Sequence, residues 1–91
     1  MKGLHIMVFG RVQGVFFRAS TKEQADVLKL VGWVRNRRDK SVEIQVFGPE
    51  TKLKQLLEWC HQGSRFSRVD RVEEKEIEGE VGGEFTIRPT V

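Results

Sequence analysis

Two spacings of apolar residues alternate along this chain, and few folds accommodate that alternation. A period of two places every second side chain on one face of a β-strand, whereas a spacing of three or four residues places side chains on one face of a helix. Strands are predicted at residues 4–9, 32–38, 42–47, 69–72 and 85–87, and helices from 17 to 29 or 30 and from 49 to about 63. The predicted order is strand, helix, strand, strand, helix and strand, followed by a short extra strand.

This order favours one arrangement of layers. Two helices covering one face of a mainly antiparallel sheet form an α+β domain of the split βαβ, or ferredoxin-like, type. Its core is predicted from the apolar stripes of the helices, which are Phe17, Thr21, Ala25 and Leu28 in the first and Leu53, Leu56, Leu57 and Cys60 in the second. We expect residues 1–91 to form a single domain, because 91 residues are too few for two folded domains.

Composition limits the cellular compartment and the kinds of partner that we expect for this chain. Its one cysteine, Cys60, has no partner for an internal disulfide, and no apolar run reaches the roughly 18 to 20 residues of a membrane span. The first nine residues lack the pattern of a signal peptide. A net charge of +3 suits an anionic partner. We therefore expect a cytoplasmic monomer that does not bind a membrane.

A glycine-bearing segment connects the first strand to the first helix. Residues 10–18 read GRVQGVFFR. Successive backbone N–H groups at such a turn can surround an anion, and Arg18 can direct two parallel N–H groups at phosphate oxygens. The spacing does not match the glycine-rich loops that bind nucleotides or dinucleotides. Taken without Arg18, the segment is equally well read as an ordinary tight turn.

A second motif lies at the predicted hairpin, and the two motifs together resemble one family. Residues 32–36 read GWVRN, and Asp39, Val42, Glu43, Gly48 and Pro49 follow. In this order and spacing, the two segments closely resemble the signatures of the acylphosphatase family. The likeness covers essentially the whole chain.

The resemblance implies an enzyme that hydrolyses small acyl phosphates to a carboxylate and inorganic phosphate. It implies that Arg18 binds the phosphate and that Asn36 orients the attacking water. The backbone amides that would form the phosphate cradle are those of Val12, Gln13, Gly14, Val15, Phe16 and Phe17. It requires no cofactor and no metal, because a carboxylate with a pKa of about 4 leaves without protonation. Without the resemblance, Asn36 would be read as a surface residue on a strand.

Two positions depart from simple expectation. The family commonly has Asp-Gly at the hairpin, and this chain has Asp39-Lys40, where a lysine in a left-handed conformation would cost roughly 1 kcal/mol. Ser20 and Glu23 also match a capping box that would begin the first helix near Thr21. The resemblance places that start near Phe17, and we adopt it.

Other functions are weaker matches. An RNA-recognition module shares the element order, but the outward residues of its third strand here would be Glu43, Gln45 and Phe47. Two of these offer no base stacking and one repels phosphate, so we expect no nucleic-acid partner. A regulatory ligand-binding domain of the same fold stays open. The arginines at 35, 37 and 38 are typical of a solvated face and could also attract anionic substrates.

The single cysteine and the two histidines suggest no further chemistry. Residues 60–65 are one residue short of the Cys-x5-Arg loop of cysteine-dependent phosphatases and do not follow a strand. Neither His5 nor His61 has a second ligand at metal-binding spacing. We interpret Cys60 as a member of the helix stripe and both histidines as structural or solvated.

Overall fold

The computed structural model describes residues 1–79 and 82–91. Its elements are β1 (Lys2–Arg11), α1 (Phe17–Val27), β2 (Val31–Asn36), β3 (Val42–Phe47), α2 (Glu50–Gln62), β4 (Arg68–Glu78) and β5 (Phe85–Ile87). The predicted order is confirmed, including the short strand at the end. Neither helix in these ranges is long and apolar enough to cross a lipid bilayer.

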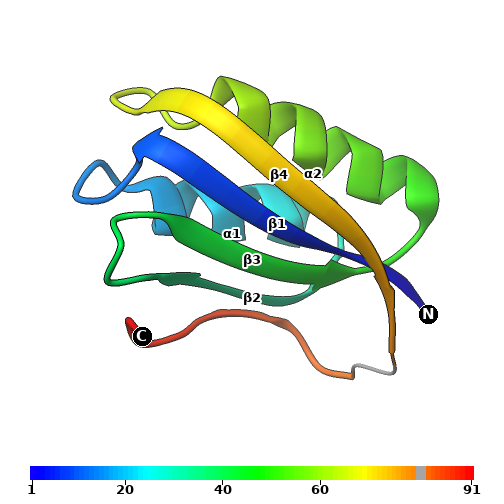
Figure 1. The fold of residues 1–91 in the computed structure, drawn as a ribbon. Coiled ribbons are helices and arrows are strands. Elements are labelled where there is room, and N and C mark those ends of the chain that lie inside the picture. Colours follow the sequence, from blue (N-terminus) through cyan, green and yellow to red (C-terminus); the bar gives the residue numbers. More distant parts are fainter. Residues whose placement is uncertain (80–81) are drawn as a thin grey trace.

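One five-stranded sheet carries both helices on the same side (Figure 1). The strand order is β4-β1-β3-β2-β5, with antiparallel pairing throughout except for the parallel pair β2 and β5. Helix α1 packs over β2 and β5, and α2 packs over β1 and β4. The ferredoxin-like fold predicted from the periodicity is therefore confirmed. The order also separates β1 from β2 by the intervening strand β3.

The core fills the space between the helices and one face of the sheet. Alternate strand residues point toward the helices and are buried, as the two-residue period requires: Leu4, Ile6, Val8, Val34, Val42, Ile44 and Val46. The helix stripes meet them through Phe17, Thr21 and Ala25 of α1 and Leu53, Leu56 and Cys60 of α2. The core predicted from the helix stripes is thus largely confirmed, with Leu28 and Leu57 only partly buried.

Helix α1 begins where the family resemblance placed it and ends earlier than its apolar spacing predicts. It starts at Phe17, and Ser20 lies inside the first turn, its N–H bonded to Phe16 O at 2.9 Å. The helix ends at Val27 because Lys29, at φ 58°, turns the chain. The N–H of Leu30 then bonds Ala25 O at 2.9 Å in a Schellman arrangement. The predicted end at 29 or 30 is therefore wrong, because it lies two or three residues beyond the observed end at Val27.

Several strand boundaries also differ from the prediction. β1 extends two residues beyond the predicted range of 4–9 at each end. β2 ends at Asn36, two residues before the predicted position, because Arg37 N–H bonds Ser41 O at 2.9 Å and begins the hairpin turn. β4 extends from Arg68 to Glu78, far beyond the apolar pair that marked it, because its outer half alternates charged residues that leave no apolar period. Of the predicted charged turn at 78–84, Glu78 lies in β4, residues 79 and 82–84 lie outside any helix or strand, and residues 80 and 81 lie outside the described residues.

The face of the sheet without helices carries a buried carboxylate. Glu43 is 7% exposed, and its Oε1 accepts hydrogen bonds from Arg35 Nε and Arg37 Nη1, both at 2.8 Å. His5 Nε2 lies 2.6 Å from the other oxygen. Arg35 and Arg37, two of the three arginines interpreted as a solvated face, therefore form ion pairs with the buried Glu43. Phe47, expected to face outward, is also buried, at 3% exposure.

Burial and hydrogen bonding act on the Glu43 carboxyl in opposite directions. Desolvation alone would raise its pKa, but the bonds from His5, Arg35 and Arg37 prevail and lower the pKa from 4.5 to about 2. A carboxyl with a depressed pKa in the folded state contributes stability above its unfolded pKa and loses it as the pH falls toward the folded one. The contribution at neutral pH is roughly 3 kcal/mol.

We expect acid to destabilise the wild type more steeply than a Glu43→Gln variant. The free energy of unfolding, measured by urea titration, should fall by roughly 3 kcal/mol more in the wild type than in the variant between pH 6 and pH 2. The variant should already be less stable at pH 6, because two guanidinium groups lose their ionised partner. Parallel pH profiles would contradict this account of the network.

Lys40 in the hairpin turn has a left-handed backbone conformation, which should lower the stability of the fold. Lys40 has φ 79° and an exposed side chain, and its N–H bonds Arg37 O at 3.1 Å, a bond that glycine keeps. Lys40→Gly should raise the free energy of unfolding by about 0.5 to 1 kcal/mol and the melting temperature with it. Lys52→Gly, at an exposed helical position of α2, should instead lower stability by about 1 kcal/mol. A fall in both variants would show that Lys40 is not strained.

Candidate active site

The chain passes from β1 to α1 through a loop of residues 12–16 whose backbone is unusual. Gly10 sits at a β-bulge with φ 135°, where a Cβ would lie 2.2 Å from Arg68 O, so only glycine fits. Gly14 at φ 71° and Phe16 at φ 60° then turn the chain twice through the left-handed region. Phe16 does so while 76% exposed. Such strain in an exposed aromatic residue is typical of functional loops.

The loop leaves its own N–H groups unused. Among the residues that the structure describes, no backbone acceptor is placed against the N–H groups of Gln13, Gly14, Val15 or Phe16. Helix α1 follows directly, with no side-chain cap and no acidic residue in its first turn. Free amides and the positive end of a helix dipole therefore face the same region. This combination favours an anion.

Side chains from two other segments hold the loop in place. Ser64, which follows α2, donates its hydroxyl to Val15 O at 3.0 Å. Gln13 extends toward the β2–β3 hairpin, where its Nε2 donates to Arg37 O and to Ser41 O, both at 2.8 Å. The loop is thus fixed to the rest of the fold by its carbonyl and side-chain groups, and its amides stay free.

Asn36 reaches the same region from the last position of β2. It shares a face with Val34, so its side chain points toward the helix layer and not toward Glu43. Gly32 allows β2 to approach its neighbour closely, since a Cβ there would lie 1.9 Å from Gln45 O. Asn36 is 9% exposed, and its Oδ1 is buried without a hydrogen-bond partner in the described part of the chain. An unpartnered buried acceptor of this kind requires an explanation.

One pocket of about 340 Å³ brings these parts together. Its lining combines the loop, the first turn of α1, the end of β2 and β5, through Val12, Gly14, Phe16, Phe17, Arg18, Ala19, Asn36 and Ile87. Arg18 and Asn36, named from the sequence, therefore meet in one pocket with part of the predicted cradle. Arg18 is half-buried and makes no ion pair with the described residues. Its guanidinium is available to an external anion.

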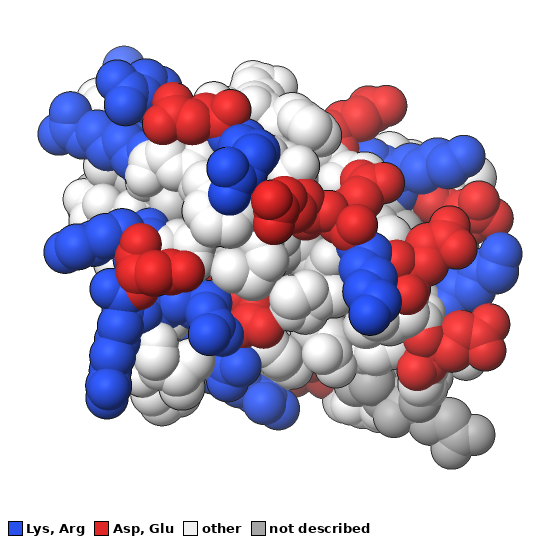
Figure 2. Space-filling model, viewed as in Figure 1, with Lys and Arg blue, Asp and Glu red and all other residues white. Residues whose placement is uncertain are grey.

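The charge on the surface is unevenly distributed. In Figure 2, Lys and Arg gather mainly at the left of the view, the end where Figure 1 shows the loop after β1 and the β2–β3 hairpin. Asp and Glu predominate at the opposite end. The loop therefore lies at the more positive end of this face, and positive potential of this kind attracts anionic ligands.

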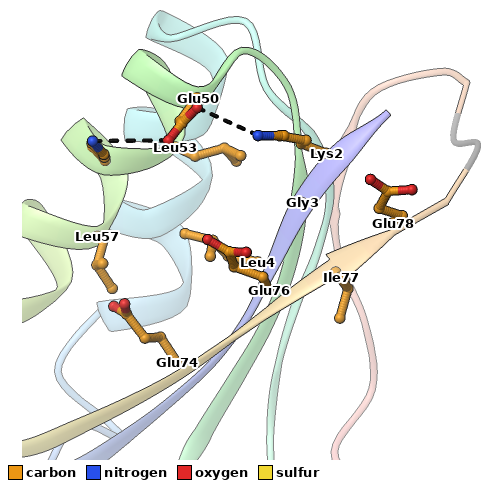
Figure 3. A pocket seen from close by; sticks show the side chains of 11 residues that line it. Lys2, Gly3, Leu4, Glu50, Leu53, Leu57, Glu74, Glu76, Ile77 and Glu78 are labelled. Atoms are coloured by element: carbon orange, nitrogen blue, oxygen red, sulfur yellow. Dashed lines mark ion pairs between the residues drawn. The ribbon is translucent and has the colours of Figure 1, made fainter.

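A second cavity, of about 360 Å³, lies at that acidic end (Figure 3). It opens between the start of β1, α2 and the outer half of β4, with Glu50, Glu74, Glu76 and Glu78 around it. Its two lysines are within 4 Å of Glu50, Lys2 at 3.6 Å and Lys54 at 3.9 Å. An anion is disfavoured there, and none of the predicted site residues lines this cavity.

Cys60 takes no part in the site. It is fully buried in the core stripe of α2, and burial raises the pKa of its thiol to about 12. The thiol is therefore un-ionised at neutral pH and is not a nucleophile. This agrees with its interpretation as a core residue.

The comparison with known proteins decides the family. Residues 4–87 match the Acylphosphatase family. The chain belongs to the acylphosphatase family. It is 49% identical over 86 residues to the acylphosphatase of Rhizorhabdus wittichii, an alignment that covers 94% of this chain and 87% of the relative. The resemblance stated from the two motifs is thereby confirmed, and acylphosphatases are enzymes.

Solved acylphosphatase structures have the same fold. The Bacillus subtilis enzyme superimposes with a TM-score of 0.91 at 43% identity, covering 97% of this chain and 99% of that one. The Coxiella burnetii acylphosphatase gives a TM-score of 0.92 at 37% identity, covering 96% and 92%. Family and fold together support acyl-phosphate hydrolysis.

Some features of the pocket were not found from the sequence. The side-chain bonds of Gln13 and Ser64 join segments far apart in the chain, and no local pattern reveals them. Ile87 was identified only as a strand residue, although it lines the pocket. The sequence does hint at the unusual conformation of Phe16, because this position directly precedes a helix and phenylalanine cannot cap a helix with its side chain.

Proposed function

We propose that this chain hydrolyses small acyl phosphates, using the loop amides and Arg18 to bind the phosphoryl group and Asn36 to orient the attacking water. The observation that supports this most strongly is the pocket in which the loop, Arg18 and the unpartnered Asn36 Oδ1 converge. None of these groups has a partner among residues 1–79 and 82–91, and an anionic substrate and a water molecule would supply one.

Phosphoryl binding follows from the free donors. The N–H groups of residues 12–17 surround the anion, and the dipole of α1 adds positive potential at the same end. Arg18 supplies a planar guanidinium that can bond two phosphoryl oxygens at once. These donors are fixed before the reaction, so they stabilise the charge of the transition state without rearranging.

The role of Asn36 follows from the two ends of its amide. The buried Oδ1 accepts a hydrogen bond from water, and Nδ2 donates one to a phosphoryl oxygen. A water molecule held in this way is positioned opposite the departing carboxylate, as in-line displacement requires. Positioning a nucleophile is among the larger contributions that a neutral side chain makes to catalysis.

The leaving group explains why this pocket needs no acid. A carboxylate has a pKa of about 4 and departs without protonation, whereas an alkoxide needs a proton or a metal. In the described part of the chain, no His, Asp or Glu lines the pocket. The proposed substrates are therefore acyl phosphates and not ordinary phosphate monoesters.

Acetyl or benzoyl phosphate and a phosphate monoester distinguish these classes. We expect release of inorganic phosphate from the acyl phosphate in the presence of EDTA, competitive inhibition by inorganic phosphate, and little release from the monoester. Hydrolysis that EDTA abolishes and magnesium restores would contradict the metal-free mechanism, and absence of hydrolysis would contradict the proposed function.

Variants at the two site residues should affect different kinetic constants. Arg18→Ala should remove nearly all activity and weaken inhibition by phosphate, because it deletes the guanidinium of the pocket. Asn36→Ala should lower kcat by roughly 10² to 10⁴ fold and leave phosphate inhibition nearly unchanged, because water is no longer oriented. Steady-state kinetics with phosphate as inhibitor measure both.

Two conservative variants serve as controls. Arg18→Lys keeps the charge but loses the planar pair of donors, so its turnover should stay far below that of the wild type. Asn36→Asp should also fail, because a carboxylate repels the phosphoryl group and cannot donate to it. Normal turnover in Arg18→Lys would show that only charge matters, and a rise in KM alone in Asn36→Ala would make Asn36 a binding residue.

A further inference from the structure

We propose that the side chain of Gln13 is a positioning residue, which fixes the loop of residues 12–16 relative to Asn36. This inference rests on the proposed function and assigns the Gln13 side chain a role separate from that of its backbone amide. Its basis is a pair of hydrogen bonds that connect two parts of the pocket arising from non-adjacent strands.

The loop and Asn36 follow from strands that do not pair with each other, so no direct strand pairing aligns them. The loop continues from β1 and Asn36 ends β2, and β3 lies between these strands in the sheet. The distance from the loop amides to the Asn36 amide therefore depends on two strand pairings in series. Across this gap the side chain of Gln13 donates both of its amide hydrogens, one to Arg37 O and one to Ser41 O, each at 2.8 Å. No other side-chain hydrogen bond among the described residues joins the loop to the hairpin.

The acceptors of Gln13 are the groups that fix the backbone next to Asn36. Ser41 O also accepts the N–H of Arg37 at 2.9 Å, and that N–H belongs to the peptide unit joining Asn36 to Arg37. Gln13 therefore bonds the same oxygen that holds this peptide, together with the carbonyl of the next one. Moving the Gln13 amide would move the support of Asn36.

The opposite face of β2 immobilises the same backbone. Arg35 and Arg37, on either side of Asn36, both bind Glu43 Oε1 at 2.8 Å. Strand alternation then directs the Asn36 side chain to the pocket. Glu43 sets the direction of the side chain, and Gln13 sets its distance from the loop. Since a misplacement of about 1 Å can cost about 10² in rate, a bond with this effect acts on turnover.

A double-mutant cycle on kcat separates positioning from general support. Gln13→Ala should lower kcat for an acyl phosphate by about 10-fold in the wild type and by less than about 2-fold in an Asn36→Ala background, because no amide is left to position. The inhibition constant of inorganic phosphate should change by less than about 3-fold, since every backbone donor remains. Gln13→Met, which keeps the length without a donor, should behave like Gln13→Ala.

Ser64→Ala provides the matched control. It removes one hydrogen bond that holds the loop, from Ser64 Oγ to Val15 O, without touching the hairpin. Its effect on kcat, whatever its size, should be the same with and without Asn36. If Gln13→Ala behaves in this additive way, or leaves kcat unchanged, the positioning role is wrong.

A spectroscopic measurement separates this inference from the proposed function. In the wild type, adding inorganic phosphate should shift the side-chain NH₂ resonance of Asn36 in an ¹⁵N–¹H spectrum, and Gln13→Ala should reduce that shift while loop amides still respond. If the protein hydrolyses no acyl phosphate but shows this pattern, the proposed function fails and the positioning role stands. An Asn36 response of the same size in Gln13→Ala as in the wild type overturns the inference even in an active enzyme.

Discussion

The loop of residues 12–16 keeps its backbone N–H groups free of acceptors from the described part of the chain, and much of the surrounding structure holds it in that state. The left-handed conformation of Phe16 adds strain, whereas Gly14 adopts the same region without steric cost. A loop with so few internal bonds would not keep one conformation alone. The bulge at Gly10 sets where it leaves the sheet, and side-chain bonds from Gln13 and Ser64 fix its course. An anion-binding site built from backbone groups thus depends on supports that never touch the anion.

The arginines of this end of the molecule differ in whether they have an ion-pair partner. The arginines at 35 and 37 are both paired with Glu43 on the face of the sheet without helices, whereas Arg18 has no ion pair in the described ranges. Because the hydrogen bonds from His5, Arg35 and Arg37 outweigh the opposing effect of burial and lower the pKa of Glu43 to about 2, this carboxylate stays ionised near neutral pH. Arg18, which lines the pocket, therefore stays available to an external anion, whereas Arg35 and Arg37 do not.

The sequence predicted the layers of this fold well because each apolar period maps onto one face of one element. It predicted boundaries less well, for physical reasons that differ between elements. Lys29 has the left-handed conformation that ends α1, a position usually occupied by glycine. Because this chain has lysine there, the sequence did not indicate where the helix ends. The outer half of β4 borders solvent and the acidic cavity, where alternation of charged residues carries no apolar signal.

The site was predictable only in part. Arg18 and Asn36 came from resemblance to a family, since the residues alone allowed a surface role for Asn36. That the structure places them in one pocket supports their proposed roles. The burial of Glu43 and the two bonds of Gln13 depend on strand register and on contacts across 38, 24 and 28 residues, which no local pattern records.

Register also explains why a neutral amide occupies the pocket. In the pairing of β2 with β3, Arg35 faces Glu43 and Asn36 faces Val42. A slip of one residue would exchange the two faces, placing an arginine toward the core side and Asn36 toward the acid. Such a register would bury guanidinium groups among apolar residues and leave Glu43 without its donors, which is strongly unfavourable. The ion-pair network on one face of the sheet therefore selects the register that delivers Asn36 to the other.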